Sequence, residues 1–81
     1  MAADTDKVEA ILRQHWQIPS DLRPGVLQDL AFRLNVLVGQ KYSHDNLKYQ
    51  LNIMQTKDLR QVYDDAACAK IASELLGTTR S

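Results

Sequence analysis

The side chains best suited to chemistry are two histidines, one cysteine and two adjacent aspartates. His15, His44, Cys68, Asp64 and Asp65 are residue types that bind zinc, and Asp64 lies one helical turn before Cys68. The spacing matches none of the common zinc motifs, because the chain has neither His-x-x-x-His nor Cys-x-x-Cys. We therefore expect no metal site and no cofactor.

These residues do not form a recognisable catalytic arrangement either. His15 lies in an apolar stripe beside Leu12 and Trp16, where it is either a general base or a neutral histidine bonded to a backbone or carboxylate group. No serine or cysteine nucleophile accompanies it in a motif. Asp64 and Asp65 point in different directions on a helix, so they are not a facing carboxylate pair. The sequence therefore predicts that the protein is not an enzyme.

One stretch offers side chains that contact nucleic acids. Residues 47–63 read as two short helical segments, roughly as in a helix-turn-helix. The second segment supplies residue types that bind phosphates and base edges. These residues are Gln55, Thr56, Lys57, Arg60 and Gln61. The fit is loose, because Asn52 replaces a turn glycine and Asp58 brings negative charge. A DNA-binding regulator is the alternative function, and a plain helical corner is the structural explanation.

Four helical segments have to position these residues. Apolar residues recur at three- and four-residue spacing between capping residues and terminators. The predicted helices cover approximately 5–17, 22–38, 43–54 and 57–76, followed by a frayed tail at 78–81. Ser43 and Thr56 are the expected N-caps of the last two helices, and Gly39 and Gly77 end the second and fourth. A break is predicted near Gln55, although one kinked helix is the alternative.

The fold class follows from these segments. Alternation of apolar and polar residues is poor, and no Asn-Gly or Asp-Gly dipeptide signals a hairpin. Short connections favour antiparallel neighbours around one core. The 81 residues therefore predict an all-α fold, a small single-domain bundle of about four helices joined by short turns.

Three of these helices carry more apolar residues than one core-facing stripe needs. At about 100° per residue, the spare residues fall opposite the main stripe of each helix. They are Phe32 and Val36 on the second helix, Tyr49 and Ile53 on the third, and Ile71 and Leu75 on the fourth. Each pair is spaced i, i+4, so its members are neighbours on the helix surface. We therefore expect these six residues to bind a partner.

The fourth helix has two interpretations. Leu59, Val62 and Tyr63 are expected in its main stripe, which leaves Ile71 and Leu75 in the second stripe together with Cys68. A helix at the centre of an irregular bundle is buried nearly all round, so the second stripe is alternatively part of the core. In either case Cys68 is expected to be a small, buried and unreactive thiol, because no cation is placed to lower its pKa.

Composition favours a protein partner. Ten basic and ten acidic residues give a formal net charge of zero, so the positive field of a nucleic-acid or membrane binder is absent. No apolar run is long enough to span a bilayer, and a single cysteine suits a reducing compartment, which predicts a cytoplasmic location. The predicted function is a small interaction module, an adaptor, inhibitor or regulatory subunit. Its predicted partner is another protein or a second copy in a homodimer.

Overall fold

The protein folds into four α-helices. The computed structural model describes residues 5–40 and 42–78, and it contains no strand within them. The helices are α1 (Thr5–His15), α2 (Pro24–Gly39), α3 (His44–Ile53) and α4 (Asp65–Thr78), and a π-helical turn η1 (Met54–Asp58) continues α3. The predicted all-α fold is confirmed. Of the predicted tail at 78–81, residue 78 is the last of α4 and the rest lies outside the described residues.

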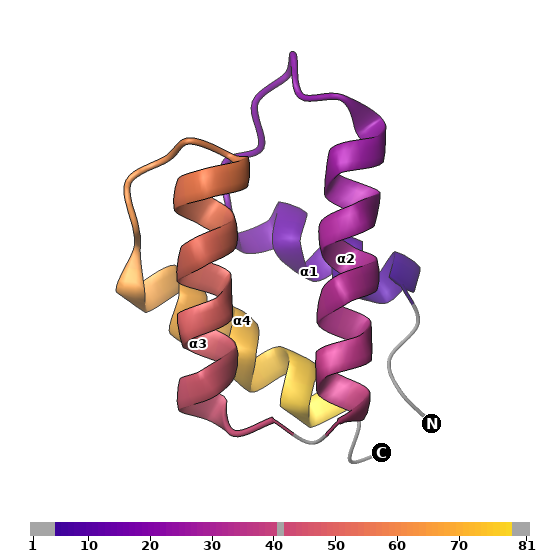
Figure 1. Cartoon of the computed structure of the whole chain (residues 1–81), viewed down its shortest axis with the longest axis vertical. Helices are drawn as coiled ribbons and strands as arrows, with labels where there is room; N and C mark the ends of the chain where they lie inside the picture. The colour runs from indigo at the N-terminus through magenta and orange to yellow at the C-terminus, as the bar shows by residue number, and fades with distance from the viewer. Residues whose placement is uncertain (1–4, 41, 79–81) are drawn as a thin grey trace.

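The helices form two layers (Figure 1). α2 and α3 run in opposite directions at the front, and α1 and α4 cross behind them. α1 packs against α2 and α4, while α3 packs against α4. An ion pair at 3.8 Å between Arg33 Nη2 and Asp58 Oδ1 links α2 to the turn after α3. No described helix covers the front of α2 and α3.

The core lies between the two layers and receives apolar side chains from all four helices. Burying each of the larger ones stabilises the fold by about 1.5–3 kcal/mol relative to leaving it in water. The largest fully buried side chains are Val8, Leu12, Leu27, Leu30, Leu34, Leu47, Leu51, Cys68, Ile71 and Leu75. None of the helices within residues 5–40 and 42–78 has the length and apolarity that a membrane span requires.

Local sequence explains where α2 and α3 begin. Pro24 is the first residue of α2, where its missing N–H costs nothing, and it holds Arg23 in an extended conformation (ψ 133°). α2 therefore starts at residue 24 and not at the predicted residue 22. The Ser43 hydroxyl accepts a hydrogen bond from the Asn46 N–H at 3.2 Å, as expected of the N-cap of α3.

The predicted helix over 57–76 is wrong in its first half. The chain continues from α3 into η1 without a break at Gln55, and then leaves helical geometry until Asp65. Arg60 has φ 54°, and it is the only residue other than glycine with a positive φ among those described. Thr56 does not cap a helix, because its hydroxyl donates to the Asn52 carbonyl at 2.9 Å inside the preceding helical turn.

The true N-cap of α4 is Asp64. Its carboxylate accepts a hydrogen bond from the Ala67 N–H at 3.1 Å, which satisfies one of the free amides of the first turn. An aspartate eight residues after Thr56 is an equally good cap by residue type. The choice between them is made by contacts with distant parts of the chain.

The later start of α4 reverses which of its stripes is buried. Val62, expected in the core, is 89% exposed, whereas Ile71 and Leu75 are fully buried. The prediction carried one helical phase from residue 57 to residue 76, but residues 59–64 are not helical, so the phase is lost. The assignment of Ile71 and Leu75 as partner-binding residues is therefore wrong. They belong to the core, as the alternative interpretation had it.

We expect Ile71→Asp to unfold the protein and Phe32→Asp to leave it folded. An unpaired carboxylate at a fully buried position costs several kcal/mol, comparable with the roughly 4–12 kcal/mol available to a chain of this size. A surface substitution changes stability by about 0.5 kcal/mol or less. Urea unfolding followed by circular dichroism measures both, with Leu34→Asp as the buried control on α2. A folded Ile71→Asp protein with the wild-type transition would contradict the burial of this stripe.

Candidate interaction surface

Three large apolar side chains remain exposed on the front layer. Phe32 is 59% and Val36 is 43% exposed on α2, and Tyr49 is 61% exposed on α3. At about 100° per residue, Phe32 and Val36 lie roughly opposite the buried Leu34, and Tyr49 lies roughly opposite the buried Leu47. All three therefore point away from the core.

These residues share one side of the molecule. The buried sides of α2 and α3 face α1 and α4, which lie behind them (Figure 1), so the opposite sides face the front. Phe32 and Tyr49 each lie near the middle of their helix. We call the surface formed by Phe32, Val36 and Tyr49 the α2/α3 face. Phe32 and Val36 are neighbours on the surface of α2, and adjoining exposed apolar residues are typical of a binding site, whereas scattered single residues are not.

An ion pair lies within the same stripe of α2. Asp29, Phe32, Arg33 and Val36 are spaced i, i+3, i+4 and i+7, so they follow one another along one side of the helix. Arg33 Nη2 lies 3.0 Å from Asp29 Oδ2, and both side chains remain about half exposed. The apolar pair is therefore accompanied by one positive and one negative charge. Asp29 and Arg33 were not among the predicted site residues, although their spacing relative to Phe32 and Val36 places them in the same stripe.

A second charged cluster lies beside Tyr49 and joins α3 to the start of α4. Asp65 Oδ1 lies 3.0 Å from Lys48 Nζ and accepts a hydrogen bond from the Tyr63 hydroxyl at 2.6 Å. The bonds from Tyr63 and Lys48 lower the pKa of Asp65. Asp65 in turn raises the pKa of Lys48, and it raises the pKa of Tyr63 to about 12. Lys48 and Asp65 therefore stay charged and paired at neutral pH.

Three of the six predicted partner-binding residues are exposed on the α2/α3 face. Ile53 is only partly exposed, and Ile71 and Leu75 lie in the core between the layers. Among the described residues, one large apolar side chain is exposed that was not predicted to be: Val62, in the connection before α4.

A buried polar network centred on Gln55 holds this connection. The Gln55 side chain is 4% exposed. Its Oε1 accepts hydrogen bonds from the Asp64 N–H at 3.1 Å and from the Cys68 thiol at 3.5 Å. Its backbone carbonyl accepts from the Gln61 N–H at 3.0 Å, and the Gln61 side chain donates to the Gln17 carbonyl at 2.5 Å. Gln55 and Gln61 therefore bind other parts of the chain.

The helix-turn-helix alternative has no recognition helix. Thr56, Lys57 and Arg60 are exposed, but the first two lie on the π-helical turn and Arg60 lies in the irregular connection. Gln55 and Gln61 are engaged in the network described above. The five residues therefore do not form the expected nucleic-acid contact surface, because the second helical segment that would present them is absent from residues 59–64.

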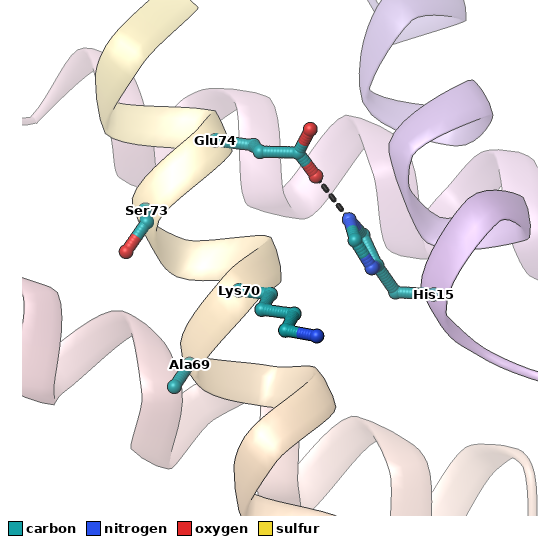
Figure 2. A pocket seen from close by; sticks show the side chains of 5 residues that line it. All are labelled: His15, Ala69, Lys70, Ser73 and Glu74. Atoms are coloured by element: carbon teal, nitrogen blue, oxygen red, sulfur yellow. Dashed lines mark hydrogen bonds and ion pairs between the residues drawn. The ribbon is translucent and has the colours of Figure 1, made fainter.

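A shallow depression of about 410 Å³ lies between α1 and α4 (Figure 2). Its lining consists of His15, Ala69, Lys70, Ser73 and Glu74. His15 Nε2 is hydrogen-bonded to Glu74 Oε2, so His15 has the carboxylate partner that one of its two interpretations required. The described residues contain no group of three or more His, Cys, Asp or Glu side chains placed to hold a metal ion. The depression therefore contains a bridge between two helices and no metal-binding arrangement.

The second histidine approaches a serine and an aspartate. His44 Nε2 lies 3.1 Å from both Ser73 Oγ and the Ala69 carbonyl oxygen, and His44 Nδ1 lies 3.7 Å from an Asp45 oxygen. A carbonyl oxygen only accepts, so Nε2 carries a proton and donates it. It cannot then take the proton of the serine hydroxyl, as a catalytic histidine must. The contact to Asp45 is too long for a hydrogen bond. His44 therefore connects the start of α3 to α4 without forming a catalytic triad.

Cys68 is buried as expected. Its side chain is fully buried, and its thiol donates to Gln55 Oε1. Burial raises the pKa of Cys68 to about 11, an effect that the indole N–H of Trp16 opposes. The thiol is therefore protonated at neutral pH and is a poor nucleophile.

Comparisons with known proteins identify no relative. No protein-family model, no curated protein and no solved structure matches this chain. The α2/α3 face therefore has to be judged from its own geometry and charge.

We expect Cys68 to make the protein less stable in alkaline solution. The pKa of its thiol is 9.0 in its ordinary state and about 11 in the folded protein. The contribution of Cys68 to the free energy of unfolding is therefore fully present below about pH 9 and is lost as the pH rises to about 11. Urea titrations across this pH range should show that the free energy of unfolding falls less for Cys68→Ala than for the wild type. Tyr63 titrates in both proteins, so equal losses would contradict the raised pKa of Cys68.

Proposed function

We propose that the protein is a small helical interaction module whose α2/α3 face binds a protein partner. The observation that carries this proposal is the exposure of Phe32 and Tyr49, 59% and 61%, on the side of the molecule that no described helix covers. Removal of such apolar surface from water is the main favourable term in protein association, about 25 cal/mol per Å².

The composition of the face fits a protein partner. Aromatic residues are enriched at the centres of protein interfaces and supply many of the residues that dominate binding energy. The tyrosine adds a hydroxyl that can bond to a partner while its ring is buried. The Asp29–Arg33 pair supplies the polar groups that accompany such an apolar centre.

Charge argues against a nucleic acid as the partner. Affinity for nucleic acids depends on unpaired lysines and arginines that displace counterions from phosphates. Arg33, which lies in the exposed stripe of α2, and Lys48, which precedes Tyr49, each pair with an aspartate at 3.0 Å. The formal net charge of the chain is zero. The proposed role is therefore that of an adaptor, inhibitor or regulatory subunit. A reducing compartment such as the cytoplasm suits the single buried thiol.

The proposal is tested by quantitative affinity capture from the native host. The baits are the wild type, Phe32→Asp, Tyr49→Asp and Val62→Asp, each first shown to be folded. Val62 is an exposed apolar residue outside the face, so Val62→Asp is the matched control. We expect a partner captured by the wild type and by Val62→Asp to fall about tenfold or more with Phe32→Asp and Tyr49→Asp. Equal recovery on all four baits would show that the face does not bind it.

A further inference from the structure

We infer that the occupant of the α2/α3 face is a second copy of this chain, with α2 packed against α2 in antiparallel orientation about a two-fold axis. This inference rests on the proposed function and names the partner. It is carried by the order of charged and apolar residues along the exposed side of α2.

The exposed stripe of α2 has the spacing with which helices pack on one another. Asp29, Phe32, Arg33 and Val36 occupy positions i, i+3, i+4 and i+7. The same spacing forms the contact seam of paired helices. Asp29, Phe32 and Val36 remain exposed. The guanidinium of Arg33 lies 3.0 Å from the Asp29 carboxylate and 3.8 Å from that of Asp58.

A two-fold contact requires a surface that is complementary to itself, because the same patch meets on both copies. An axis that passes α2 midway between Asp29 and Arg33 places Asp29 of each copy opposite Arg33 of the other. Phe32 lies one residue from that midpoint, so the two phenyl rings meet beside the axis. Offset or edge-to-face contact between aromatic rings is favourable beyond the area that it buries. One arrangement therefore pairs both charges and buries both phenylalanines.

The existing ion pair does not oppose this arrangement. Asp29 is 64% and Arg33 is 47% exposed while they are paired within α2. An exposed ion pair one turn apart contributes little to helix stability. Asp29 and Arg33 can therefore separate at little cost and each pair with the opposite charge on the other copy.

Charge fits a second copy better than a strongly acidic or a strongly basic partner. A strongly acidic partner would leave Asp29 facing a like charge, and a strongly basic partner would do the same to Arg33. A second copy matches both. The formal net charge of zero adds no general repulsion between copies.

Sedimentation equilibrium of the full chain, from about 1 to about 200 µM, measures the pairing. We expect a wild-type dimer in this range, and an increase of about 30-fold or more in its Kd for Phe32→Asp. Val62→Asp should retain the wild-type Kd. Circular dichroism verifies that each variant is folded. Phe32→Asp leaves the contact between Arg33 and Asp58 intact, so its result does not depend on that ion pair.

Charge reversal tests the antiparallel orientation. Asp29→Arg and Arg33→Asp each place like charges opposite one another in a homodimer, so each alone should dimerise about tenfold more weakly than the wild type. Mixed in equal amounts, the two variants should form a heterodimer with a Kd near that of the wild type, because opposite charges again face each other. A merely structural role for the pair within α2 would not produce this rescue.

The outcomes separate this inference from the proposed function. A wild type that stays monomeric overturns the second copy as occupant, while a captured host protein that is lost with Phe32→Asp would still support the face as a binding surface. A dimer with the same Kd in Phe32→Asp overturns the pairing through α2. Absence of a heterodimer in the mixture of charge variants overturns the antiparallel arrangement.

Discussion

Gln55 is the polar group on which the placement of α4 depends. A buried carboxamide without partners is costly, and this one is satisfied by the Asp64 N–H and the Cys68 thiol, both from the start of α4. To bring them there, the chain passes through the π-helical turn and the left-handed conformation of Arg60 before it becomes helical again. α4 consequently crosses behind α3 and does not extend it (Figure 1).

This placement divides the surplus of apolar residues into two classes. With α1 and α4 behind the front layer, Ile71 and Leu75 of α4 point into the core. Phe32, Val36 and Tyr49 point to the side that no described helix covers. The same i, i+4 apolar pattern is therefore core on α4 and surface on α2, and only the position of neighbouring helices distinguishes them. The proposed binding role rests on the residues that the fold leaves exposed.

The parts of the structure that depend on local interactions could be predicted from the sequence. The helical fold, the Ser43 cap and the exposure of Phe32, Val36 and Tyr49 follow from periodicity and residue type. The start of α4 could not be predicted, because Thr56 and Asp64 are both acceptable caps and the contacts of Gln55 decide between them. Hydrogen bonds such as the one between His15 and Glu74 join residues that are distant in the sequence, so no local pattern predicts them.

The chain itself covers Ile71 and Leu75, whereas we propose that a second copy covers Val36. The most direct test is nuclear magnetic resonance relaxation of methyl groups by a soluble paramagnetic probe, in the wild type and in Phe32→Asp at equal concentration. Val62, which is 89% exposed, supplies the reference for full accessibility. Weak relaxation of the Ile71 and Leu75 methyls in both proteins, with Val36 protected in the wild type and accessible in the variant, is the predicted result. Relaxation at Ile71 as strong as at Val62, or no difference at Val36 between the two proteins, would contradict the account.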